Sequence, residues 1–136
     1  MIGTHWIGDL EKASIENPNF RAVLYTGPNT QLTVMSLAPG EEIGYEVHED
    51  HDQFIWIAQG HGRVDLRQPD EDVEHAIHVE RNWAVVVAAG TPHNVVNVGP
   101  HDLKLFSIYA PPEHADGTVH HTKAEAEAGE RATIEH

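Results

Sequence analysis

Eight short apolar segments, separated by turn residues, constrain the fold of this chain more than any other feature. Each segment is five to eight residues long and contains valine, isoleucine, leucine or aromatic residues. The segments cover residues 21–26, 31–37, 53–58, 62–67, 74–80, 84–89, 94–98 and 103–110. The connections between them, such as GPN, PGEE and QPDED, contain the glycine, proline or asparagine that turns need. Strands spaced about 8–12 residues apart are typical of an antiparallel sandwich or barrel, so the sequence predicts an all-β fold.

A short helix is expected on each side of this β region. Asp9 can cap a helix within GDLEKASIENPNF, and Asn17 can end it. Beyond the strands, Thr122 and Glu125 have the spacing of a capping box, and no further regular strand is expected there. The sequence therefore divides into an N-terminal segment (1–20), a barrel domain (21–110) and a partly helical C-terminal tail (111–136).

Length and composition exclude several classes of protein. A chain of 136 residues has the length of one domain. It contains no cysteine, which excludes disulfides, thiolate metal sites and a cysteine nucleophile. Its formal net charge of −14 repels nucleic acid and anionic lipid, so neither is expected as a partner. No apolar run reaches the roughly 18 residues of a membrane span and the N-terminus does not read as a signal peptide, so we expect a cytoplasmic protein.

The first stretch with candidate chemistry is PGEEIGYEVHEDHDQFIWIAQGHG, residues 39–62. After the turn at its start, a strand is expected to carry Glu46 and His48. Residues two apart on a strand point to the same face, so these two side chains can converge on one ion. Gln53, which opens the next strand, could supply a further, weaker oxygen ligand.

The second stretch is NWAVVVAAGTPHNVVN, residues 82–97. A strand runs into a turn, and His93 opens the following strand. Because Pro92 restricts the backbone before it, the position of the imidazole is set by the chain. Together with Glu46 and His48, His93 would form a set of two histidines and one carboxylate, which leaves coordination positions open on a metal ion.

These two stretches resemble the two conserved motifs of the cupin superfamily. The first family motif is glycine, five residues, His-x-His, three or four residues, glutamate, six residues, glycine. In this chain the corresponding positions are Gly40, Glu46, His48, Gln53 and Gly60. The spacing matches throughout, with glutamate in place of the first histidine and glutamine in place of the glutamate.

The second family motif is glycine, five residues, Pro-x-Gly, two residues, histidine, three residues, asparagine. Here Asn82 stands for the first glycine and Ala88 for the proline. Gly90, His93 and Asn97 match the family residues. The second motif therefore keeps its histidine ligand.

The resemblance implies both a fold and a ligand set. It covers about residues 20 to 110 and is closest to small, single-domain cupins of the mannose-6-phosphate-isomerase-like kind. The implied fold is a double-stranded β-helix, a jelly-roll barrel, with short terminal helices. The resemblance places metal ligands at Glu46, His48, Gln53 and His93 in the barrel mouth. The divalent ion is left open among iron, manganese, zinc and nickel.

Two classes of function follow from this reading. The first is a metal-dependent enzyme acting on a small polar substrate, with isomerase or lyase chemistry at a Lewis-acidic ion, or with dioxygenase chemistry. The second is a non-catalytic module that binds a small molecule or a metal. A metal-free β-domain used only in assembly is a third and weaker reading.

Other residues compete with the ligand set or lie outside it. His51 is the strongest rival ligand, because a loop does not obey the alternation of a strand. Asn97 is expected to form hydrogen bonds in a strand or turn rather than to coordinate. Surface positions are expected for His61, His75 and His78, and no catalytic role is expected for His114, His120 and His121 in the tail.

A homodimer is expected, both from the family resemblance and from strands that are apolar on two faces. Phe54 and Trp56 lie on one face of their strand, which is the best candidate for the contact. The opposite parity should face inward. Residues expected to point into the barrel are Met35, Ile55, Ile57 and Val95.

Overall fold

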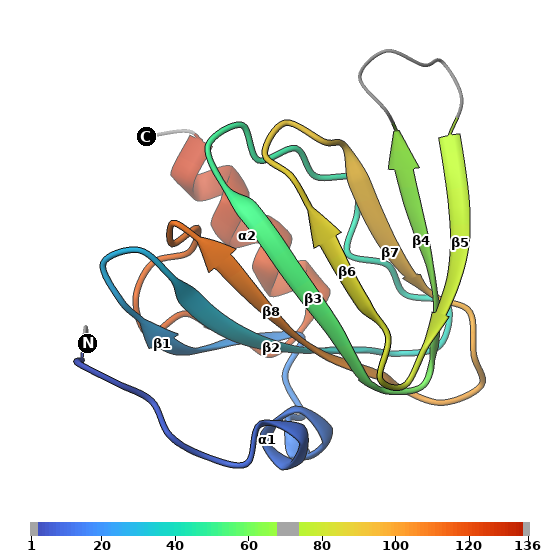
Figure 1. Ribbon diagram of the computed structural model, residues 1–136, viewed down its shortest axis with the longest axis horizontal. Coiled ribbons are helices and arrows are strands. Elements are labelled where there is room, and N and C mark those ends of the chain that lie inside the picture. The colour runs from blue at the N-terminus through green and yellow to red at the C-terminus, as the bar shows by residue number, and fades with distance from the viewer. Residues whose placement is uncertain (1–2, 68–73, 135–136) are drawn as a thin grey trace.

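The computed structural model describes residues 3–67 and 74–134 as two antiparallel β-sheets and two helices (Figure 1). The larger sheet has the strand order β6 (Ala84–Val87), β3 (Asp52–Gln59), β8 (Leu103–Ala110), β2 (Gln31–Leu37), β1 (Arg21–Thr26) and β9 (Val119–His120). The smaller sheet has the order β5 (Glu74–Glu80), β4 (His61–Arg67) and β7 (His93–Asn97). All eight apolar segments form strands, β1 to β8, and the jelly-roll expectation is confirmed. The predicted turn at residues 68–72 lies outside the described residues.

Both predicted helices form with the caps that their sequences indicate. Helix α1 (Leu10–Glu16) begins after Asp9, whose side chain accepts a hydrogen bond from the backbone N–H of Lys12, and it ends at Asn17. Helix α2 (Lys123–Ile134) starts with a capping box. In that box the backbone N–H of Glu125 donates to Thr122 Oγ1 over 3.1 Å, and the Thr122 N–H donates to Glu125 Oε2 over 3.2 Å.

One short strand follows residue 110, where no further regular strand was expected. The short strand β9 pairs with β1, with Arg21 opposite His120 and Ala22 opposite Val119. A strand of two residues is too short to show a periodic pattern in sequence. By pairing with β1, strand β9 satisfies backbone groups that would otherwise be unpaired at an open sheet edge.

The expected strand through Glu46 and His48 is also absent as a regular strand. The chain there runs along β7, to which it is joined by isolated bridges. Gly44 adopts a φ of +101° and its N–H donates to Asn94 Oδ1, which interrupts a regular ladder. The side chains of Glu46 and His48 nevertheless lie in contact with each other, as described below.

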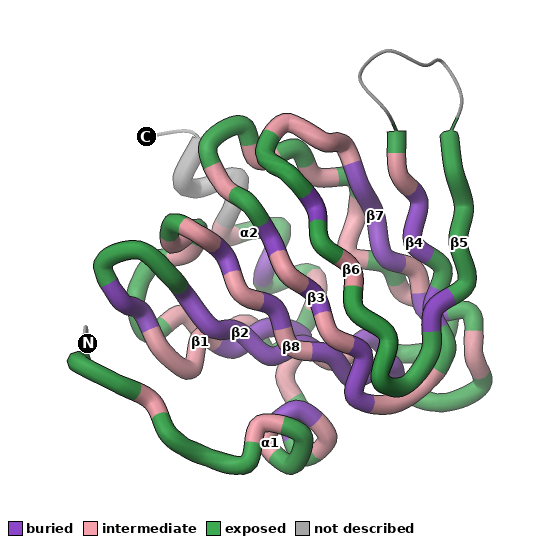
Figure 2. Tube along the Cα trace, in the orientation of Figure 1, coloured by how far each residue is buried: buried purple, intermediate pink, exposed green. Residues whose placement is uncertain are grey.

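The hydrophobic core lies between the two sheets. The four residues predicted to point inward are at most 1 % exposed: Met35, Ile55, Ile57 and Val95. Along β3 buried residues alternate with partly exposed ones, so that Phe54 and Trp56 lie on the outer face (Figure 2). Figure 1 shows α2 behind the sheets, and its Ala126 is part of the core. Neither described helix has the length and apolar character that crossing a bilayer requires.

Gly60, the last glycine of the first motif, carries the chain from β3 in one sheet to β4 in the other. Its φ is +98°, and an added Cβ would lie 2.9 Å from the backbone oxygen of Asp102. Gly40 also has a positive φ, of +82°, but a Cβ there would meet nothing within 4 Å. We expect Gly60→Ala to lower the free energy of unfolding by about 1–2 kcal/mol more than Gly40→Ala, because only Gly60 faces a backbone clash. Urea unfolding measures both, and equal losses would contradict this account.

Candidate metal centre

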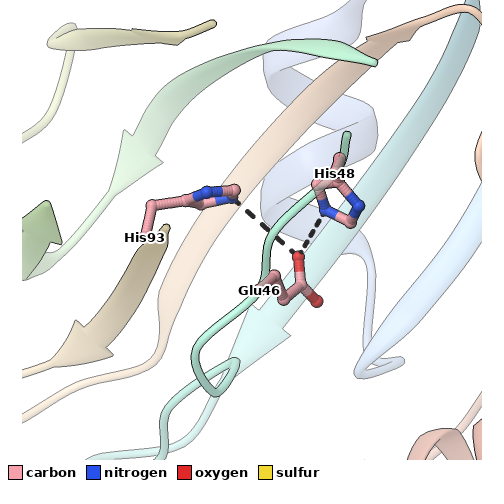
Figure 3. Close-up of side chains that lie close together, drawn as sticks. All are labelled: Glu46, His48 and His93. Carbon is pink, nitrogen blue, oxygen red and sulfur yellow. Dashed lines mark hydrogen bonds and ion pairs between the residues drawn. The ribbon is translucent and has the colours of Figure 1, made fainter. Parts of the chain in front are cut away.

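Three of the four predicted ligands come together between the sheets: Glu46, His48 and His93 (Figure 3). His48 Nε2 lies 2.9 Å from Glu46 Oε2, and His93 Nε2 lies 4.0 Å from the same oxygen. One ligand atom from each residue falls within 4.8 Å of the other two. The carboxylate lies between the two imidazole rings (Figure 3).

Backbone pairing sets this arrangement. Glu46 and His93 form an isolated bridge, in which each backbone N–H donates to the other residue's carbonyl over 2.9 and 3.0 Å. The carbonyl of His48 accepts from the N–H of Gly90 in the turn before β7. Two segments about 45 residues apart in sequence are thereby held side by side. The ligands therefore sit on a fixed backbone.

The ring of His93 is oriented for coordination through Nε2. Its Nδ1 lies 2.9 Å from the carbonyl oxygen of Thr91, so Nδ1–H donates to that oxygen. In a neutral imidazole this leaves on Nε2 a lone pair that faces two acceptor oxygens, Glu46 Oε2 and Gln53 Oε1. The His93 side chain is only 4 % exposed, which restricts its other rotamers.

Gln53 lies directly beside the three residues. Its Oε1 is 2.9 Å from His93 Nε2, and its Nε2 donates to Ser107 Oγ over 2.8 Å. The side chain is buried on β3, facing inward. Its amide thus contacts the nitrogen that would bind a metal, and coordination by Gln53 stays a prediction.

We expect Gln53→Glu to bind a divalent metal about tenfold more tightly than the wild type, because a carboxylate replaces a weak amide donor. The same change should lower the free energy of unfolding of the metal-free protein by about 1–3 kcal/mol, since it buries a charge. Denaturant unfolding with and without metal measures both effects. If neither quantity changes, residue 53 does not contact the metal position.

Arg21 holds the far oxygen of the Glu46 carboxylate. Its Nη2 lies 3.7 Å from Glu46 Oε1, and the arginine is 1 % exposed at the start of β1. Because Oε1 faces the guanidinium, Oε2 is the oxygen turned toward His48 and His93. The sequence did not indicate which of its arginines points inward.

Glu113 contacts His48 from the other side. Its Oε1 lies 3.5 Å from His48 Nδ1, so the imidazole lies between two carboxylates. The segment after β8 is tied to β2 by Gln31, whose Oε1 accepts from the backbone N–H groups of Glu113 and His114. A carboxylate on the remote nitrogen of a histidine is the usual partner of a metal-bound imidazole. Nothing in the sequence around Glu113 indicates this contact.

His51, the rival ligand, is directed elsewhere. Its Nε2 lies 3.0 Å from Glu113 Oε2, and its Nδ1 lies 2.7 Å from the carbonyl oxygen of Pro111. Both ring nitrogens therefore face the segment that follows β8, and His51 is outside the group formed by Glu46, His48 and His93.

The charges around the centre shift the pKa values of its groups. Burial alone would raise the pKa of Glu46, but the hydrogen bond from His48 and the charge of Arg21 together lower it. The hydrogen bonds to Glu113 and then Glu46 raise the pKa of His48 to about 9, against the opposing effect of burial. Two cations and two carboxylates therefore balance one another here at neutral pH.

The donor set fits a divalent transition metal. Two imidazole nitrogens and one carboxylate oxygen suit iron, manganese, zinc or nickel. Ligands about 2.0–2.1 Å from a tetrahedral ion are roughly 3.3–3.5 Å apart, and the observed separations of 2.9 and 4.0 Å lie on either side of that value. The partners on the remote atoms, Thr91 and Glu113, also match those of metal-bound histidines.

Asn97 has the structural role predicted for it. Its Nδ2 donates to the carbonyl oxygens of Leu37 and His101, and its Oδ1 accepts from the N–H of Gly99. It is 1 % exposed. Asn97 thus closes the turn between β7 and β8 and does not face the ligand group.

Comparison with known proteins identifies the family. Residues 33–109 match the sequence model of a protein family that is described as the cupin domain. The uncharacterized protein YrkC of Bacillus subtilis (strain 168) is 46% identical over 125 residues, which are 92% of this chain and 67% of YrkC. The crystal structure of BH2720 from Bacillus halodurans matches with a TM-score of 0.84 and 43% identity, covering 90% of this chain and 93% of that one.

A more distant structure shares the fold. KdgF from Halomonas sp. matches with a TM-score of 0.60 and 22% identity, over 68% of this chain and 78% of that chain. The family model spans more than half of the sequence, and it contains Gln53 and His93 together with Glu46 and His48. The chain therefore belongs to the cupin superfamily.

Proposed function

We propose that this cupin binds a divalent metal through Glu46, His48 and His93 and acts as a metal-dependent enzyme on a small polar substrate. The observation that carries the proposal is the convergence of two imidazole nitrogens and one carboxylate oxygen within 4.8 Å, from two segments distant in sequence. Isomerase or lyase chemistry and dioxygenase chemistry are both compatible with this set. The mannose-6-phosphate-isomerase-like subtype remains a prediction.

The residues of the chain have distinct parts in this proposal. Glu46, His48 and His93 hold the ion, while Arg21 and Glu113 orient two of these ligands. When bound, the ion would supply Lewis-acid chemistry toward a carbonyl, or redox chemistry if it is iron. With one carboxylate ligand the loaded centre keeps a net positive charge, which favours an anionic or carbonyl-bearing substrate.

A non-catalytic binding module is the second candidate, and burial of the ligands favours it. The side chains of His48, Glu46 and His93 are 11, 18 and 4 % exposed. Metal sites that are closed by protein are usually structural, whereas catalytic sites keep an open position. Access to the ion therefore separates the two candidates.

Elemental analysis of the full chain, purified without added metal or affinity resin, is the first test. We expect near-stoichiometric iron, manganese, nickel or zinc, and loss of that metal in His48→Ala. A chain that holds no metal after purification, and takes up none when each ion is added, would overturn the proposal. Iron would direct the next assays to oxygen uptake with candidate carbonyl compounds.

Substitution with Co²⁺ then tests catalysis against simple binding. Azide that changes the visible spectrum of the Co²⁺ protein would show an exchangeable coordination position, as the enzyme reading requires. A spectrum that is insensitive to azide would favour the binding module. The same titration on His93→Ala controls for Co²⁺ bound elsewhere.

The homodimer expected from the sequence also stays a proposal. The rings of Trp56 and Phe106 stack 6.2 Å apart on the outer face of the larger sheet. Val86, which pairs with Phe54, is 75 % exposed. This apolar face is the surface that a second copy of the chain would cover. Sedimentation of the wild type and of Trp56→Glu measures the association.

A further inference from the structure

A second group of metal-ligating side chains lies on the outer face of the hairpin formed by β4 and β5: His61, His78 and Glu80. It is separate from the centre described above. His93 is paired with Leu66, and His61 is five residues away along β4, a distance of roughly 16 Å on a strand.

The strand register produces this group. His61 lies directly opposite Glu80, and His78 is two residues before Glu80, so all three share one face. The pattern of an imidazole and a carboxylate two residues apart, joined by an imidazole from a neighbouring strand, repeats that of Glu46, His48 and His93. Here, however, both contributing strands are regular.

The three donor atoms converge on one point. His61 Nδ1 lies 3.2 Å from His78 Nε2 and 3.6 Å from Glu80 Oε2. His78 Nε2 lies 3.9 Å from the same oxygen. Three ligands of a tetrahedral zinc ion are roughly 3.3–3.5 Å apart, so small rotations of these side chains would complete the geometry.

The neighbouring cation does not compete for this position. Arg63 is opposite His78 in the ladder, but its Nε and Nη2 donate to the two carboxylate oxygens of Asp65 over 2.8 and 3.1 Å. The side chains of His61, His78 and Glu80 are about half exposed, so the outer side of the group is open to water. A bound ion would therefore complete its coordination with water.

We propose that His61, His78 and Glu80 form a second site for a divalent transition metal such as zinc. Two imidazoles and one carboxylate select zinc, nickel or copper over magnesium or calcium, which prefer oxygen ligands. In the described sheet β5 is an edge strand that pairs with β4 alone. The ion cross-links these two strands across their outer face and thereby holds the edge strand in place.

Titration with Zn²⁺ in the His93→Ala background tests this site without the inner centre. We expect one saturable Zn²⁺ ion per chain by calorimetry, with affinity lowered at least about tenfold when His78→Ala is added. His75→Ala is the matched control, since it removes another exposed imidazole from β5 at a position of opposite parity. Equal affinities with and without His78 would overturn the proposal, whatever the inner centre binds.

Hydrogen exchange gives an independent readout of the cross-link. At a free Zn²⁺ concentration 100 times the Kd, openings that break the site should become about 100-fold rarer, which slows exchange of the amides that pair β4 with β5. The effect should vanish in His61→Ala. Zn²⁺ that binds but leaves these amides unchanged would contradict the cross-linking role.

Discussion

Replacing Glu46 with glutamine is expected to lower the affinity of the inner centre for divalent metal by at least about 100-fold. The amide keeps the shape of the side chain but removes the charge that attracts the ion. The substitution also removes the negative charge that Arg21 and His48 contact. His93→Ala should have an effect of similar size, because it deletes the ligand whose orientation Thr91 fixes.

The matched control for this experiment is Glu49→Gln, which removes an exposed carboxylate from the same segment. Affinity is measured by competition with a chromophoric chelator in the His78→Ala background, so that an ion on the β4–β5 face is not counted. Circular dichroism verifies that each variant is folded. Wild-type affinity in Glu46→Gln, or an equal loss in Glu49→Gln, would place the metal elsewhere.

The sequence predicted the fold because the relevant signals are local. Turn residues divide the chain into strands, and capping residues such as Asp9 and Thr122 set the helix starts. The juxtaposition of His48 with His93 required more than local signals, since the two lie in different segments. The prediction of this juxtaposition rested on the spacing of two family motifs. The structure shows why these motifs end in Gly60 and Asn97, since both residues form turns.

The inward position of Arg21 could not be predicted, because it depends on a bulge. Near the hairpin turn Thr26 pairs with Gln31, and an unbroken register would place Arg21 opposite Ser36. The register shifts by one residue between Val23 and Tyr25, so Arg21 pairs with the fully buried Met35 instead. A shift of one residue moves a side chain to the other face of a sheet.

The part played by Glu113 was hidden for a different reason. It follows the last long strand, in a stretch without periodic signal, and reaches His48 because Gln31 on β2 binds its backbone. Long-range hydrogen bonds of this kind leave no trace in local composition. The sequence predicts no catalytic role for the tail histidines, yet one of them, His114, is partly buried.

His114 is the residue from which we expect a large loss of stability in acid. Its ring packs edge-on against Tyr109 at 5.2 Å, and its Nε2 has no hydrogen-bond partner among the described residues. Burial and then the positive charge of Arg21 lower the pKa of His114 to about 4, and Glu113 and Glu46 offset this only in part. The folded protein therefore keeps this imidazole neutral well below the usual value of 6.5.

The sign of the effect follows from proton binding. Between pH 6.5 and 4, His114 binds a proton in the unfolded chain but stays neutral in the folded chain. The contribution of His114 to the free energy of unfolding is therefore fully present above pH 6.5 and is lost as the pH falls. The loss at pH 4 amounts to about 3 kcal/mol in the free energy of unfolding.

His114→Phe keeps an aromatic ring against Tyr109 but cannot titrate. Between pH 7.5 and pH 4, its free energy of unfolding should therefore fall by about 3 kcal/mol less than that of the wild type. Urea unfolding at pH 7.5 and pH 4 measures the difference, with His101→Phe as an exposed control. Parallel losses in the wild type and in His114→Phe would show that this imidazole accepts its proton without unfolding, and that acid acts on the fold through other groups.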